Sequence, residues 1–118
     1  MKYLCLVYCE EETLNALSAD EMNVLVNDSL DYDDALQKAG HLIVAQALEP
    51  VQAASTLRVR NGGLAITDGP FAETKEQLLG FILIEAREQD DAIRAASKIP
   101  MARLGSIEVR PIKELARP

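Results

Sequence analysis

Two segments of the chain, residues 2–9 and residues 77–85, are apolar on both of the faces that a β-strand presents. In residues 2–9 the alternating sets are Leu4, Leu6 and Tyr8 on one face and Tyr3, Cys5, Val7 and Cys9 on the other. A strand that hides both faces belongs inside a sheet that is covered on both sides. The chain must therefore build a sheet with a covering layer on each face.

A long helix is predicted between Ser18 and Gly40, after a short helical turn within residues 11–17. Ser18 and Glu21 form a capping box at its start, and Gly40 stands where helices commonly end. Its apolar stripe is expected to face the core: Met22, Leu25, Val26, Ser29, Leu30, Ala35, Leu36 and Ala39. Its aspartates are expected on the solvated outer side: Asp28, Asp31, Asp33 and Asp34.

The remaining segments complete the order β-α-β, hairpin, β-α-β. Strands are expected at residues 41–48, 77–85 and 105–112, a second helix from Asp90 to the Pro100 stop, and a hairpin at 56–67 around the turn Asn61-Gly62-Gly63. This order is that of an α+β, ferredoxin-like split βαβ fold with a β-hairpin insert, in one domain over residues 1–118. Right-handed crossovers place both helices on one face of the four-stranded sheet. A second copy packed on the bare face would cover it, which predicts a homodimer.

Charge and composition exclude several classes of protein. The net charge is −7 and no basic run is present, so no nucleic-acid partner is expected. No apolar run approaches the roughly 20 residues of a membrane helix, and residues 2–9 are typical of a strand rather than a signal peptide. Cys5 and Cys9 would lie about 13 Å apart on one strand, too far to form a disulfide. We therefore expect a cytoplasmic protein with two buried thiols and no membrane contact.

The segment from Asp68 to Glu76 combines a turn, both charge signs and an aromatic residue between two apolar segments. Pro70 has a fixed φ and no N–H, and Gly69 tolerates left-handed backbone, so the chain must break there. The run Asp68-Gly69-Pro70-Phe71 with Glu73-Thr74-Lys75-Glu76 resembles the signature of the DGPF family, a branch of the YciI-like proteins. The resemblance spans Tyr3 to Ile112 and implies a dimeric α/β barrel.

His41 and Asp68 are the candidate catalytic residues. His41 is the only histidine, the residue type best suited to acid–base chemistry at neutral pH, although it could instead cap the preceding helix. Asp68 could orient His41 or take a proton from substrate, or it could only shape an Asx turn. Gly40-His41-Leu42 resembles the family's Gly-His-Leu, and the resemblance to YciI-like proteins implies a His–Asp pair. Shorter YciI-like chains lack the hairpin, so the assignment to Asp68 depends on the DGPF branch.

The site is expected in the cleft between His41 and the 68–76 loop, with three candidate substrate-binding residues: Thr67, Lys75 and Arg103. Lys75 would hold an anion, or else decorate a solvated turn with its acidic neighbours. Arg103 lies in a stretch that is typical of the family. Phe71 is expected to plug the core rather than to stack on a ligand. Arg58 and Arg60 share one hairpin face and suit protection of an edge strand better than a carboxylate clamp.

Two functions remain open, and neither requires a cofactor or metal, because no nucleotide fingerprint, phosphate loop, nucleophile elbow or metal-ligand cluster is present. The first is a cofactor-independent enzyme of the isomerase, lyase or dehydrohalogenase kind. His41 and Asp68 would transfer a proton of a small organic acid or ring compound. The second is a non-catalytic module that binds a small molecule or a protein partner. The enzyme is the preferred hypothesis.

Overall fold

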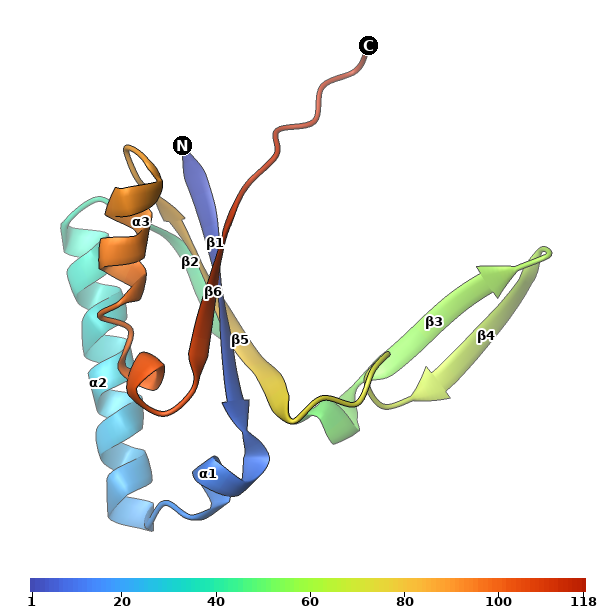
Figure 1. The fold of residues 1–118 in the computed structure, drawn as a ribbon, viewed down its shortest axis with the longest axis horizontal. Coiled ribbons are helices and arrows are strands. Elements are labelled where there is room, and N and C mark those ends of the chain that lie inside the picture. Colours follow the sequence, from blue (N-terminus) through green and yellow to red (C-terminus); the bar gives the residue numbers. More distant parts are fainter.

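The computed structural model describes residues 1–118 as a four-stranded sheet with helices on one face and a separate two-stranded hairpin (Figure 1). The main sheet contains β1 (Lys2–Glu10), β2 (Leu42–Ala47), β5 (Glu76–Glu85) and β6 (Ser106–Pro111). The helices are α1 (Glu11–Asn15), α2 (Ala19–Lys38) and α3 (Gln89–Ala96), with short 3₁₀ helices η1 (Val51–Ala53) and η2 (Pro100–Arg103). The hairpin consists of β3 (Ser55–Arg60) and β4 (Gly63–Asp68).

The main sheet has the strand order β2-β5-β1-β6, and all neighbouring strands are antiparallel. The two doubly apolar segments form the central strands β1 and β5, as predicted. Cys5 lies opposite Ile82 and Tyr3 opposite Ile84, and all four are buried in a cluster with residues of α2 and α3. This arrangement confirms the α+β, ferredoxin-like split βαβ fold with a β-hairpin insert.

Local signals set both ends of α2. The Glu21 N–H donates to Ser18 Oγ at 3.0 Å and the Ser18 N–H donates to Glu21 Oε1 at 2.9 Å, so the predicted capping box forms. The bond from the Ser18 N–H also lowers the pKa of the Glu21 carboxyl, because it stabilises the charged form. At the other end, Gly40 has a φ of 80° and ends the helix in left-handed backbone.

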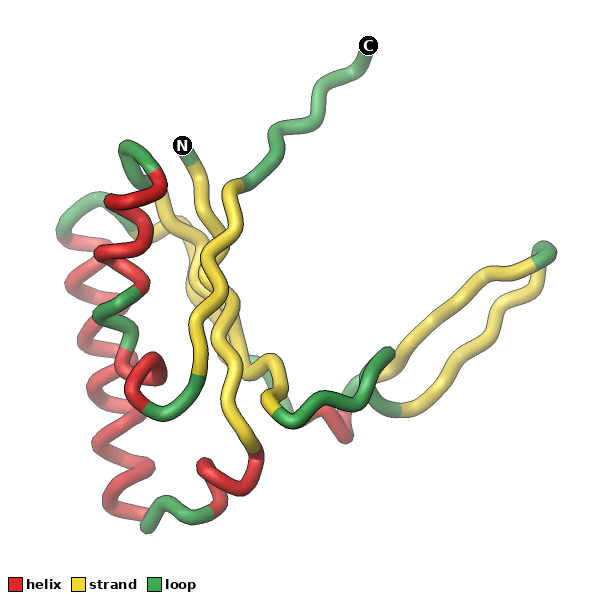
Figure 2. Tube along the Cα trace, viewed as in Figure 1, coloured by secondary structure: helices red, strands yellow, loops and turns green.

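The hairpin turns at Asn61 and Gly62, whose φ angles of 52° and 75° are those of a two-residue type I′ turn. Its base is closed by the Gly69 N–H, which donates to the Ala54 carbonyl at 2.7 Å. The hairpin projects away from the main sheet, on the side opposite to α2 and α3 (Figure 2). The Cα radius of gyration is accordingly 16.4 Å, larger than the roughly 13.5 Å of a compact domain of this length.

The face of the main sheet that carries no helix is uncovered in the single chain. Leu4, Leu6 and Tyr8 of β1, with Phe81 and Leu83 of β5, are only partly buried there. An apolar face of this kind normally meets a partner. The homodimer that would cover it stays a prediction.

Two further expectations concern the thiols and the membrane. Cys5 and Cys9 are buried and unpaired, as predicted. Burial raises the pKa of Cys5 to about 11, because a thiolate is poorly solvated in an apolar interior. None of the helices combines the length and the apolar character needed to cross a membrane.

Candidate functional site

A cavity of about 600 Å³ lies between α2 and the main sheet. Its walls come from α2 between Met22 and Asp33, from α1, from the end of β2, from the start of β5 and from residues 99–101. Of its 24 lining residues, 15 are hydrophobic, which is the usual character of a site for a small organic ligand. The volume also falls within the range of roughly 300–1,000 Å³ that such sites occupy.

The apolar stripe of α2 forms one wall of this cavity, which corrects the prediction that the whole stripe packs in the core. Leu25 and Leu36 are buried, but Val26 and Leu30 are 48% and 57% exposed. Both line the cavity, as does Met22. Figure 1 shows α1 and its connection to α2 at this end of the molecule, between the sheet and the start of α2. The part of α2 from Met22 to Asp33 therefore borders the cavity, while Leu36 in its last turn packs in the core.

Three titratable side chains line the cavity: Asp33, Tyr32 and Glu11. Burial raises the pKa of Asp33, and the neighbouring Asp34 raises it further. Asp33 was predicted on the solvated side of the helix, and its half-buried position in the cavity wall corrects that prediction. The pKa of the Tyr32 hydroxyl is also raised, chiefly by burial, and the hydroxyl donates to the Ala95 carbonyl. No lysine, arginine or histidine lines the cavity.

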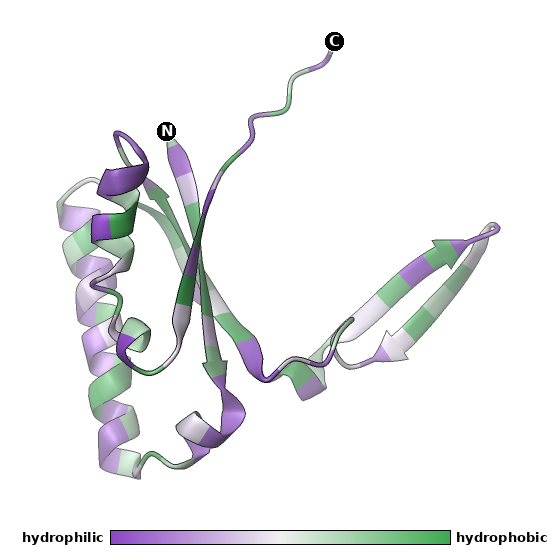
Figure 3. Cartoon of the chain, viewed as in Figure 1, coloured by the Kyte–Doolittle hydropathy of each residue, from purple (hydrophilic) through white to green (hydrophobic).

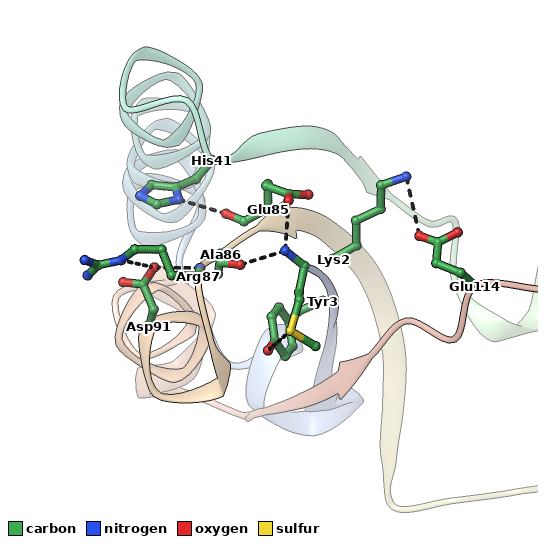
Figure 4. A network of polar contacts seen from close by, with 9 residues as sticks. Lys2, Tyr3, His41, Glu85, Ala86, Arg87, Asp91 and Glu114 are labelled. Carbon is green, nitrogen blue, oxygen red and sulfur yellow. Dashed lines mark hydrogen bonds and ion pairs between the residues drawn. The ribbon is translucent and has the colours of Figure 1, made fainter.

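His41 lies outside the cavity, at the junction of α2 with the sheet (Figure 4). Its Nδ1 is 2.8 Å from the Glu85 carbonyl oxygen. Its main chain is held as well, since its N–H donates to the Leu36 carbonyl at 2.9 Å and its carbonyl accepts from the Glu85 N–H at 2.8 Å. These three bonds fasten the end of α2 to the end of β5, so His41 has a structural role in addition to any chemical one.

Asp68 lies far from His41 in the same chain. His41 is hydrogen-bonded to Glu85, the last residue of β5. Asp68 is the last residue of β4, and the 69–75 loop connects it to the first residue of β5. The ten residues of β5 span roughly 30 Å at ~3.3 Å per residue. One chain therefore does not bring the two residues together, and a His41–Asp68 pair stays a prediction that would need a second chain. Thr67, next to Asp68 on the hairpin, is likewise exposed and outside the cavity.

The other predicted binding residues are also placed elsewhere. Lys75 is exposed and its Nζ lies 3.6 Å from Glu10, which fits the solvated-turn interpretation. Arg103 forms an ion pair with Asp28 at 3.5 Å and borders a shallow groove on the other side of η2 and α2. Phe71 is 80% exposed, so the prediction that it plugs the core is wrong. The physical reason is that the 69–75 loop follows the hairpin out of the main sheet and has no core to enter.

Sequence reasoning missed the cavity carboxylate, although the helical period contains a signal for it. Asp33 stands four residues after Ser29 and three before Leu36, so it continues the apolar stripe rather than the acidic face. A carboxylate on the apolar stripe of an amphipathic helix is unexpected unless that stripe meets solvent or a ligand.

Comparisons with known proteins identify the family. The YCII-related domain matches residues 1–116. A protein of Rhizobium meliloti (strain 1021), described as uncharacterised, is 40% identical over 114 residues, which are 95% of this chain and 92% of the relative. The fold is similar to that of 5-chloro-2-hydroxyhydroquinone dehydrochlorinase (TftG) from Burkholderia phenoliruptrix AC1100, solved with 2,5-dihydroxybenzoquinone. That match has a TM-score of 0.56 and 16% identity, and it covers 96% of this chain and 94% of the other. The chain belongs to the YCII-related domain family.

Proposed function

We propose that this protein is a cofactor-independent acid–base enzyme of the isomerase, lyase or dehydrohalogenase kind, acting on a small ring compound in the cavity beside α2. The observation that carries the proposal is the position of Asp33. It is a half-buried carboxylate with a raised pKa in the wall of a mainly apolar cavity. A carboxylate with a raised pKa in a concave site is a candidate general base, because a higher pKa makes it a stronger base.

The acidic side chains in the cavity wall favour one class of substrate over another. The only carboxyl groups of the cavity are those of Glu11 and Asp33, and no lysine, arginine or histidine lines it. An organic acid would enter as an anion and be repelled in a site of low dielectric constant, with no cation to pair with. The cavity therefore favours an uncharged ring compound over the organic acid that the sequence left open.

The proposed chemistry needs only a proton transfer. Asp33 removes a proton from a ring carbon or a ring hydroxyl of the substrate. The electron pair released either expels a leaving group as an anion, in an elimination, or is captured by a proton at another ring position, in an isomerisation. Neither outcome needs an oxidant. A ring compound bound against the apolar walls would displace water and so strengthen the interaction between Asp33 and the acidic proton.

The fold relative is consistent with this proposal without deciding the reaction. TftG is named as a dehydrochlorinase and was solved with a quinone ring compound. One fold can host many functions, so at 16% identity the likeness is evidence for the scaffold and not for the chemistry. The reaction class must therefore be tested on this chain itself.

The test compares two neighbouring aspartates of α2. Asp33 lines the cavity, whereas Asp34 is exposed and does not. Asp33→Asn and Asp34→Asn remove the same charge from adjacent positions, so Asp34→Asn is a matched control. We would measure turnover of a panel of halogenated and hydroxylated ring compounds. We expect Asp33→Asn to lower kcat about 10²- to 10⁴-fold and Asp34→Asn to change it less than about threefold.

Two outcomes would contradict the proposal. Equal activity of the two variants would remove Asp33 from the reaction. Loss of turnover in His41→Ala and Asp68→Asn, with Asp33→Asn active, would instead place the chemistry at a His–Asp pair built from two chains.

A second candidate function is a non-catalytic small-molecule-binding module, favoured by the fact that the only histidine stays outside the cavity and is bonded through Nδ1. The same panel separates the two candidates. A compound that raises the melting temperature of the wild type without being turned over would support the binding module, and the enzyme proposal would fail.

A further inference from the structure

The β3–β4 hairpin has one apolar face that nothing in its own chain covers. The register pairs Leu57 with Ile66 and Val59 with Leu64, so these four side chains share one face. They are 60%, 61%, 62% and 60% exposed, respectively. Figure 3 shows apolar residues at intervals along both hairpin strands, away from the main sheet. An isolated two-stranded hairpin is marginally stable in water, so this one needs a surface to pack on.

The opposite face of the hairpin is basic. Arg58 and Arg60 are its two cations, and over residues 55–68 Asp68 is the one acidic residue, for a net charge of +1. The whole chain carries −7, so the residues outside the hairpin carry −8. The hairpin thus has the opposite sign of charge to the rest of the chain, so charge repulsion does not oppose contact between a hairpin and the body of another copy.

The hairpin also lies beside the other uncovered apolar surface of the molecule. Figure 1 shows it on the side of the main sheet that bears no helix. On that face Leu4, Leu6 and Phe81 are only partly buried. A second copy seated on the sheet face would stand next to the hairpin, and two-fold symmetry would give each copy the same pair of contacts. Phe71, 80% exposed in the loop that leaves the hairpin, adds a large apolar side chain to the same region.

We propose that the hairpin of residues 55–68 is an exchange arm, whose apolar face packs on a second copy of this chain in a reciprocal homodimer. The sheet-face dimer expected from the sequence would bring the copies together, and the arms would extend the contact around the partner. The arm is therefore a specific element of the interface and not a solvent-exposed insert. This role is independent of the reaction in the cavity.

The test uses two adjacent residues on opposite faces of β4. Ile66→Asp puts a charge on the apolar face, whereas Ala65→Asp puts the same charge on the polar face, opposite Arg58. We would measure the dimer dissociation constant by sedimentation equilibrium, and amide hydrogen exchange in residues 55–68 over a range of protein concentrations.

We expect the wild-type arm to be protected from exchange at concentrations where the protein is dimeric, and to lose that protection on dilution to monomer. Ile66→Asp should raise the dissociation constant about 100-fold and remove the protection, since central apolar contacts carry most of an interface's affinity. Ala65→Asp should change the dissociation constant less than about threefold.

Three results would overturn the proposal. A wild type that stays monomeric at 100 μM or so would show that no second copy covers the arm. Arm amides that exchange rapidly in a dimer would show that the dimer forms without it. Protection that persists in the diluted monomer would show that the arm folds back on its own chain.

Discussion

Two leucines of α2 offer a direct test of where the helix leaves the core. Leu36 is 5% exposed and belongs to the core cluster, whereas Leu30 is 57% exposed and lines the cavity. The substitution Leu→Ala is the same at both positions, in the same helix. Any large difference in the free energy of unfolding must therefore come from the surroundings of the two side chains.

The structure sets the size of that difference. Leu→Ala removes three carbon groups, which at ~0.8 kcal/mol each give about 2.4 kcal/mol for a fully buried side chain. At Leu36 a new void adds to this, for a total of about 3–4 kcal/mol. Leu30 keeps less than half of its surface out of water. Its truncation should cost about 1 kcal/mol, because it enlarges an existing cavity and creates no new one.

Urea denaturation at fixed protein concentration is the appropriate assay, since the predicted self-association would make stability depend on concentration. The expected difference of about 2 kcal/mol corresponds to a midpoint shift of about 1 M urea for an m-value of ~2 kcal/mol/M. Equal losses in the two variants would mean that α2 is packed as tightly around Leu30 as around Leu36. The cavity, and the site built on it, would then be wrong.

Three further predictions test the packing and the electrostatics. Gly105→Ala should destabilise the fold by at least about 2 kcal/mol in urea denaturation, because its Cβ would overlap the Tyr8 carbonyl oxygen. Gly63→Ala should cost less than half as much, since its Cβ meets only one backbone atom at an ordinary 3.4 Å. At pH 8, Cys5 should react with iodoacetamide at least about 100-fold more slowly in the native protein than in the unfolded chain, as followed by mass spectrometry. A pKa raised from 9.0 to about 11 lowers its thiolate fraction by that factor, and similar rates would contradict its burial. Burial raises the pKa of Asp33, so in the interval above the ordinary 3.8 the native state keeps a proton that the unfolded chain has lost. The free energy of unfolding should therefore fall as pH rises through that interval, and thermal melts should show a smaller fall in Asp33→Asn. An unchanged pH profile would count against the burial of Asp33.

The fold was predictable because its elements carry strong local signals. The Ser18–Glu21 capping box and the glycine at position 40 set the ends of α2 without help from tertiary contacts. Asn61-Gly62 alone specifies the hairpin turn, since both residues accept positive φ. The double apolar pattern of β1 and β5 then determines which strands lie at the centre of the sheet.

The candidate site was less predictable, because helical periodicity identifies an apolar face but not what that face contacts. Val26 and Leu30 have the spacing of core residues, yet they line a cavity. His41 and Asp68 were predicted to form a pair because each stands at the end of a strand. Strands end on two opposite sides of a sheet, however, so this position alone does not bring two residues together. Only the antiparallel register shows that these two lie at opposite ends of β5.

The charged side chains of this acidic chain are unevenly distributed over the structure. A net charge of −7 argues against nucleic acid as a partner, but it does not say where the cations are. In the structure, Lys75 and Arg103 form ion pairs on the surface, and Arg58 stands on the hairpin. None of these cations reaches the cavity, whose ionisable walls are acidic. The distribution of charge, rather than its sum, therefore supports the proposal of an uncharged ligand in the cavity and is compatible with the proposed packing of the hairpin on a second copy.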